Sequence, residues 1–216
     1  MKKKILSLTL VVCLLAIAVV GGTLAYFTDD DNAENTFTVG NVTIDLFEPA
    51  WDGINADGVK EGNGQGLIDS ESVYPGEALA KDPQVKNEGE NICFVRVKVE
   101  NLDQFGRDNM ITLRHGECEL GYDTDNWVQL GDYYYFYRTG TYEGQTLTSG
   151  VLQLGETTAP VFNQIVIPTG IENDAEAQPI NVTAEAVQAQ GARASLAEVI
   201  AMTPAEIAAW FGTCGL

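Results

Sequence analysis

Histidine and the short motifs of common catalytic sites are scarce in this chain of 216 residues. His115 is the only histidine, so the two-histidine HExxH arrangement of zinc proteases cannot be built. No G-x-S-x-G motif is present, which excludes that form of serine hydrolase site. No C-x-x-C pair or His/Cys spacing typical of a metal site occurs either. The sequence therefore predicts that the protein is not an enzyme, has no catalytic residue and no cofactor, and uses His115 as an ordinary loop or strand-end residue.

Basic residues are also few, with 12 lysines and arginines against 31 acidic residues and a formal net charge of -19. Proteins bind nucleic acid largely by neutralising phosphates, so nucleic acid is excluded as a partner. Anionic membrane surfaces and cell-wall polymers would repel the chain unless divalent cations screened its charge. A strong net charge also keeps a protein soluble and opposes self-association until something triggers it.

The first 25 residues have the pattern of a secretory signal peptide. Three lysines at residues 2–4 precede an apolar run from Ile5 to Val20, and small residues follow at Thr23 and Ala25. These features predict cleavage between Ala25 and Tyr26, which leaves one domain over 26–216 with a net charge of about -22. The alternative is an uncleaved anchor, because the run is just long enough to cross a bilayer. No LPxTG-type sorting signal is present, which disfavours covalent attachment to a cell wall.

Three cysteines remain after the predicted cut: Cys93, Cys118 and Cys214. An odd number means that at least one thiol is free or paired between chains, and the disulfide state stays open. Cys93 lies in the clearest strand pattern of the chain, in phase with Val95 and Val97, while Arg96 lies in the opposite phase. This phase places Cys93 on the core face, where a cysteine is usually inert packing.

The rest of the body also alternates between apolar and polar residues, which is typical of strands. Strands are predicted at Thr36–Phe47, 91–101, Asn126–Leu130, Tyr133–Arg138, Val161–Ile167 and Ile180–Gln188. Glycine, proline, asparagine and aspartate clusters separate them, as expected of turns. Short strands without alternating helices predict an all-β fold, an antiparallel jelly-roll-like β-sandwich.

Two segments depart from this pattern. Residues 52–66 contain five glycines and predict a long exposed loop. Residues 195–212 predict two short helices, each with a capping box: Ser195 with Glu198, and Thr203 with Glu206. The second helix presents an apolar face that should dock on the sandwich or on a partner, and Gly212 should end it. Its face is formed by Ile207, Trp210 and Phe211.

Two further motifs suggest binding. The acidic turns at 29–31, 55–58 and 123–126 are rich in oxygen ligands, but none fits the EF-hand frame, so calcium is only a weak possibility. The aromatic run at 133–137 places alternate rings on opposite faces, and sandwich packing is the favoured use of both sets over a glycan or partner surface.

Several stretches together resemble one family. "GGTLAYFTDDDNAENTFTVGNVTIDL" is similar to the processing region of proteins exported with the dedicated signal peptidase SipW, typified by the biofilm fibre protein TasA and by camelysin. "SVYPGEALAKDPQVKNEGENICFVRVKVE", "DNWVQLGDYYYFY", "LGETTAPVFNQIVIP" and "INVTAEAVQAQG" resemble successive strands and turns of the same domain. The resemblance covers most of the mature chain and leaves out the glycine-rich segment and about the last 25 residues.

The resemblance implies a secreted jelly-roll protein that assembles into matrix fibres, outside or on the surface of a Gram-positive-type bacterium. In such fibres the mature N-terminal segment of one subunit adds as a strand to the next, here residues 26–39 with Phe27, Phe37 and Val39 as donor side chains. The partners implied are other copies of the chain and the signal peptidase during export; whether the fibres also need an accessory matrix subunit stays open. The alternatives are a monomeric surface-associated adhesion module, a solvated terminus at 26–35, and a camelysin-like metalloprotease.

Overall fold

The computed structural model describes residues 42–54, 56–59, 64, 66, 73–116, 119–171, 178–191 and 194–213, with only the backbone given for 119–120. The chain divides into two compact units, Met1–Thr38 and Val39–Leu216, and every described residue belongs to the second. The predicted signal peptide, its cleavage residues and the donor segment therefore lie outside the described residues. So do Cys118 and Cys214.

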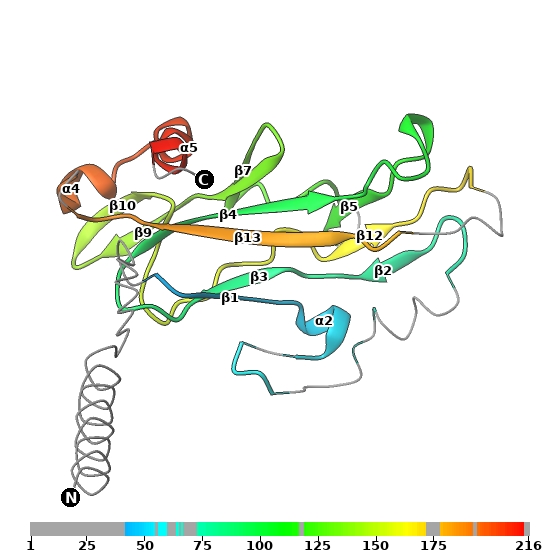
Figure 1. Ribbon diagram of the computed structural model, residues 1–216, viewed down its shortest axis with the longest axis horizontal. Helices are drawn as coiled ribbons and strands as arrows, with labels where there is room; N and C mark the ends of the chain where they lie inside the picture. The colour runs from blue at the N-terminus through cyan, green and yellow to red at the C-terminus, as the bar shows by residue number, and fades with distance from the viewer. Residues whose placement is uncertain are drawn as a thin grey trace, which may run out of the picture. The chain divides into compact units, whose positions relative to one another are not determined.

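A five-stranded antiparallel sheet is organised around one long strand (Figure 1). This central strand is β4 (Cys93–Glu100), and β13 (Asn181–Gln188) pairs with it along its whole length. The opposite edge of β4 is shared by β8 (Tyr133–Phe136) and β11 (Val151–Leu152), and β7 (Trp127–Leu130) extends the sheet beyond β8.

The remaining strands form smaller antiparallel sheets. One contains, in order, β2 (Ala78–Ala80), β12 (Gln164–Val166), β5 (Thr112–His115) and β6 (Glu119–Leu120). Another pairs β1 (Ile44–Phe47) with β3 (Gln84–Asn87), and a hairpin pairs β9 (Arg138–Tyr142) with β10 (Gln145–Ser149). A short helix α2 (Pro49–Asp52) follows β1, and a 3-10 helix η2 (Arg107–Asn109) precedes β5. The antiparallel β class is confirmed, and the jelly-roll topology stays a prediction.

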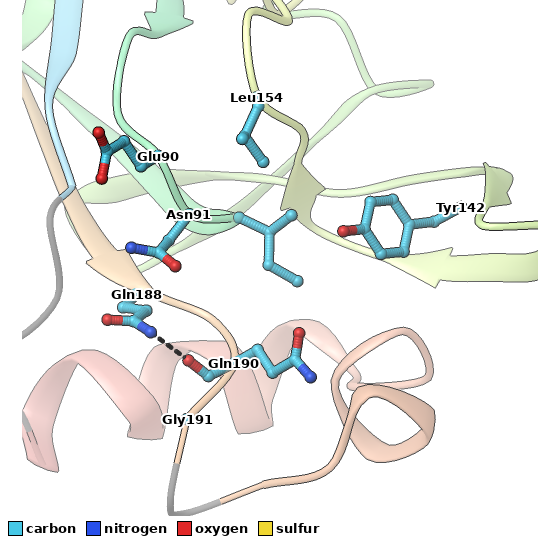
Figure 2. A pocket seen from close by; sticks show the side chains of 8 residues that line it. Glu90, Asn91, Tyr142, Leu154, Gln188, Gln190 and Gly191 are labelled. Carbon is cyan, nitrogen blue, oxygen red and sulfur yellow. Dashed lines mark hydrogen bonds between the residues drawn. The ribbon is translucent and has the colours of Figure 1, made fainter.

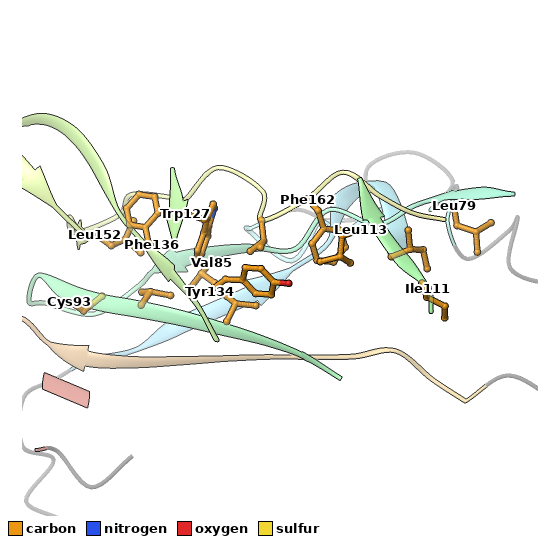
Figure 3. Packing of buried hydrophobic residues seen from close by; sticks show 14 of the residues in the cluster. Leu79, Val85, Cys93, Ile111, Leu113, Trp127, Tyr134, Phe136, Leu152 and Phe162 are labelled. Carbon is orange, nitrogen blue, oxygen red and sulfur yellow. The ribbon is translucent and has the colours of Figure 1, made fainter. Parts of the chain in front are cut away.

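The main core lies between the five-stranded sheet and the β2–β12–β5 and β1–β3 sheets (Figure 3). Cys93, Val95 and Val97 of β4 are completely buried there, which confirms the predicted phase of this strand. Facing them are side chains such as Val85 of β3 and Ile165 of β12. The two layers therefore bury one face of the five-stranded sheet, as a sandwich requires.

A second core covers the opposite face of the same sheet. Phe94 and Tyr135 point into it from the strands, and helices α4 (Leu196–Val199) and α5 (Pro204–Thr213) close it with Ile207 and Phe211. Both predicted capping boxes are present, since Glu198 bonds back to Ser195 and Glu206 to Thr203. The apolar face of α5 docks on the sandwich, and Trp210 Nε1 donates to the carbonyl of Gln188 at 3.0 Å.

The structure corrects three sequence expectations. Helix α5 does not end at Gly212 but continues to Thr213. The predicted strand Tyr133–Arg138 is interrupted at Tyr137, whose backbone N–H bonds to Asn126, so that β8 ends and the hairpin begins. The loop predicted at 52–66 does not include Asp52, because Asp52 is the last residue of α2.

Arg96 lies on the face of β4 opposite Cys93, as its strand phase predicts, and this face is covered. Its side chain is only 6% exposed and lies between the rings of Tyr133, at 3.9 Å, and Phe211, at 4.5 Å. Its guanidinium also forms an ion pair with Glu185 on β13. This pair compensates the positive charge of Arg96, which α5 covers.

The aromatic run behaves as the packing hypothesis expects. Tyr134 and Phe136 belong to the main core, whereas Tyr135 belongs to the second core with Tyr133 and Tyr137 packed against it. Within the described part of the chain, no helix has the length and apolar character needed to cross a membrane.

Candidate functional site

Strand β13 forms one edge of the five-stranded sheet. All eight of its residues pair with β4 on one side. Among the residues that the structure describes, no strand pairs with its other side. The sequence of β13, "NVTAEAVQ", contains neither lysine nor proline, the residues that commonly protect edge strands from pairing with another chain. Within the described residues, the backbone groups along this edge are therefore not paired with another strand.

Half-buried apolar side chains lie beside this open edge. Strands β1 and β13 contact each other across the layers, and their inward side chains pack against the main core without being fully covered. We call this set the edge seam: Val42, Ile44, Leu46, Val182, Ala184 and Ala186. An added strand could place apolar side chains against the seam while its backbone pairs with β13.

On the outward face of β13, an ion pair joins this strand to β4. Glu185 accepts from Arg96 at 2.5 and 2.6 Å, and Arg96 is itself held between aromatic rings of β8 and α5. A partly buried ion pair with this geometry keeps β13 aligned on β4. The open edge is thus joined to β4 by side-chain contacts as well as by backbone pairing.

The other side of the seam is anchored by a charged cluster after β1. Glu48 pairs with the buried Lys81 at 2.7 Å, and the Lys81 ammonium lies 4.5 Å from the centroid of the Trp51 ring. The carboxylate of Asp82 accepts from the N–H of Ala50 at 2.7 Å. These contacts bind α2, and with it the end of β1, to the corner between β2 and β3.

Asp82 makes this anchor sensitive to pH. Burial, opposed by the Ala50 N–H and reinforced by the negative charge of Glu48, raises the pKa of Asp82 to about 6 from an ordinary value of 3.8. The folded state therefore binds this proton more tightly than the unfolded chain does. The contribution of Asp82 to the free energy of unfolding consequently falls as pH rises from about 4 to about 6.

The substitution Asp82→Asn should increase the free energy of unfolding at pH 7.5 by about 1 kcal/mol, a value reduced for the half-exposed position of the carboxyl group. Asparagine keeps an acceptor for Ala50 and carries no charge to desolvate. Urea unfolding at pH 4.5 and pH 7.5 measures the effect, and the gain should be absent at the lower pH. The exposed Asp103→Asn is the matched control. An equal gain at both pH values would refute the role of Asp82 ionisation.

Cys93 shows no sign of a reactive thiol. It is completely buried, and burial, together with the charge of Glu156, raises its pKa to about 12. The nucleophilic form of cysteine is the thiolate, which this environment strongly disfavours. Cys93 is therefore a packing residue, as its strand phase indicated.

The described residues do not fit a zinc protease centre. His115 Nε2 lies 3.9 Å from Asp123 Oδ1, and the buried His115 Nδ1 has no hydrogen-bond partner. Asp123 already accepts from the N–H of Asp125 and the amide of Asn126. A zinc site needs at least three protein ligands, and no group of three or more candidate ligands occurs in the described ranges. Glu117 and Cys118, next to His115 in sequence, lie outside those ranges.

The acidic turns proposed for calcium are occupied by other contacts where they are described. Asp57 pairs with Lys86 at 2.8 Å, and the Asp123 carboxylate caps its own turn. Residues 29–31 and Asn55 lie outside the described residues. A calcium site stays a prediction.

The structure brings together a site that the sequence did not single out. Thr23, Ala25, Tyr26, Phe27, Phe37 and Val39, the predicted cleavage and donor residues, all lie outside the described residues. The sequence did predict a strand at Ile180–Gln188, but its position at an edge depends on which strands pair, and no local signal reports that.

Comparison with known proteins gives one family. The sequence pattern of the family described as camelysin metallo-endopeptidase matches residues 1–105. No curated protein and no solved structure matches the chain. The matched part includes β1, β3 and β4, which contribute both to the main core and to the edge seam. The first 105 residues of the chain are therefore similar to the camelysin family.

Proposed function

We propose that the mature chain is a secreted structural protein that assembles into extracellular fibres by strand addition. Residues 26–39 of one copy pair with the open edge of β13 in the next copy. The observation that carries this proposal is the eight-residue edge of β13, which is unpaired among the described residues and lies beside the edge seam. The family match supports it at the level of family only.

The length of the donor segment suits this edge. Fourteen residues in extended conformation span about 46 Å, whereas eight residues of β13 span about 26 Å. The segment is therefore long enough to pair with the whole edge. Alternation places Phe37 and Val39 on one face of the added strand, where they can cover the edge seam.

Leader cleavage and net charge would both control when the donor segment can pair with another copy. While the leader is attached, the segment follows a membrane-bound sequence, and cleavage after Ala25 would free its end. The net charge of the mature chain, about -22, opposes close packing of subunits. Salt screens exposed charges within about 8 Å at physiological ionic strength, and acid neutralises them, so both should speed assembly.

Electron microscopy of the secreted protein tests the proposal. Intact-mass analysis should first show that the chain begins at Tyr26, and filaments should then form faster at pH 4.5, or in added salt, than at pH 7.5 in low salt. Full-length chain in the membrane fraction would restore the anchor alternative. A correctly processed protein that forms no filaments under any of these conditions would favour a monomeric adhesion module instead.

Proteolysis is the activity that the family description names. In the part of the chain that the structure describes, no group of three or more histidine, cysteine, aspartate or glutamate side chains could hold a metal ion. We therefore derive no proteolytic step for this chain.

A further inference from the structure

A polar cavity lies at the end of β13. Its volume is about 350 Å³, which is at the lower end of the range for small-ligand sites. Four separate segments line it: the turn before β4, the end of β9, the loop after β11, and the chain leaving β13 (Figure 2). Sites built from converging segments of this kind are usual for ligand binding.

Most side chains around the cavity carry neutral hydrogen-bonding groups. Asn91, Gln188 and Gln190 contribute carboxamides, Tyr142 a hydroxyl and Glu90 a carboxylate. Figure 2 shows Asn91, Tyr142 and Gln190 among the residues that line the cavity. In the described part of the protein, no hydrogen bond engages these three side-chain groups, so their donors and acceptors can meet a ligand.

The frame of the cavity is held firmly. Asn87 Nδ2 donates to the carbonyl of Asn91 at 2.9 Å, and Gln188 Nε2 donates to the carbonyl of Gln190 at 2.5 Å. The N–H of the buried Ala189 bonds to Ile92, and Trp210 of α5 holds the Gln188 carbonyl. The backbone positions of the amide-bearing residues are thus set before any ligand arrives, which lowers the entropic cost of binding.

The composition of the lining excludes several ligand classes. It contains neither lysine nor arginine, and the chain is strongly acidic, so phosphates and other anions are disfavoured. A single carboxylate is too few for a calcium or zinc ion. Only two apolar side chains, Ile92 and the 52% exposed Leu154, reach the cavity, which is too little for a hydrophobic ligand.

We propose that this cavity binds one pyranose unit of a neutral saccharide. A carboxamide presents a donor and an acceptor side by side, which matches two neighbouring hydroxyl groups of a sugar. Leu154 and the ring of Tyr142 supply apolar surface for the C–H groups of the ring. The inference does not depend on fibre assembly, since the cavity belongs to a single domain.

Saturation-transfer NMR on the mature chain, residues 26–216, tests the site. The probes are the methyl glycosides of glucose, mannose and galactose, with N-acetylglucosamine and glucuronic acid for comparison. At least one neutral probe should bind, and glucuronic acid should bind more weakly because Glu90 repels it. Asn91→Ala and Gln190→Ala should each weaken binding about three- to tenfold, the value of one lost hydrogen bond.

The control variant is Gln129→Ala on β7, an exposed glutamine outside the cavity, which should bind as the wild type does. Absence of transfer to every neutral probe at about 10 mM, a level where even millimolar sites are populated, would overturn the proposal. So would unchanged binding in the Asn91→Ala, Gln190→Ala double variant. Displacement of a bound glycoside by a peptide of residues 26–39 would also overturn it, by assigning the cavity to strand addition.

Discussion

Removal of residues 26–35 from the mature chain should abolish fibre growth and leave the domain folded. The main core is built from side chains of β1 onward, so the truncation removes none of its described members. It does remove Phe27 and most of the donor backbone. Burying one phenylalanine contributes about 1.5–3 kcal/mol, and each main-chain hydrogen bond adds about 0.5–1.5 kcal/mol, so loss of the segment removes most of the proposed interface.

Filament growth followed by light scattering and electron microscopy measures this effect. Circular dichroism and a urea midpoint establish that the truncated domain is folded. A free peptide of residues 26–39 should occupy the β13 edge and inhibit wild-type assembly, whereas a scrambled peptide of the same composition should not, because its side chains no longer alternate. Normal fibre growth by the truncated protein would show that strand addition by this segment is wrong.

The substitution Phe211→Ala should lower the free energy of unfolding by about 3–5 kcal/mol, the usual cost of removing a fully buried aromatic ring. Phe211 is 0% exposed, meets the ring of Tyr135 edge-on at 5.8 Å and covers the guanidinium of Arg96. Its loss would leave a cavity beneath α5 and let water reach the Arg96–Glu185 pair. The C-terminal helix would then be shown to be part of the fold rather than an appendage.

Urea unfolding of the two proteins at one pH gives the measurement. Ala209→Ser is the matched control, because Ala209 lies on the exposed face of the same helix and its replacement should cost only about 0.5 kcal/mol. A loss below about 1 kcal/mol for Phe211→Ala would mean that α5 contributes little to the stability of the domain. Since α5 also carries Trp210, the variant should in addition loosen the end of β13.

Local patterns in the sequence were sufficient for some elements of this protein. The alternation in β4 predicted both the strand and the buried side of Cys93, because a strand repeats every two residues wherever it lies. The capping boxes at Ser195 and Thr203 predicted where the C-terminal helices begin, since these bonds join residues only three apart. The resemblance of the first half to one family was likewise readable from its motifs, and the family match agrees with it.

The sequence did not predict several of the shortest strands. Strands β2, β3 and β5 have only three or four residues each, too few for a periodic signal to stand out from turns. They exist because neighbours distant in sequence pair with them, as β12 does with both β2 and β5.

Burial of the second sheet face and the location of the open edge were decided only by the tertiary structure. Alternation shows that Arg96 and Cys93 point in opposite directions, but whether the face of Arg96 is covered depends on α5, more than one hundred residues later. In the same way, β13 is an edge because, among the described strands, only β4 pairs with it. Both outcomes result from pairing and packing between segments that are distant in the sequence. The free energy of these contacts depends on which surfaces meet, so local sequence patterns do not report it.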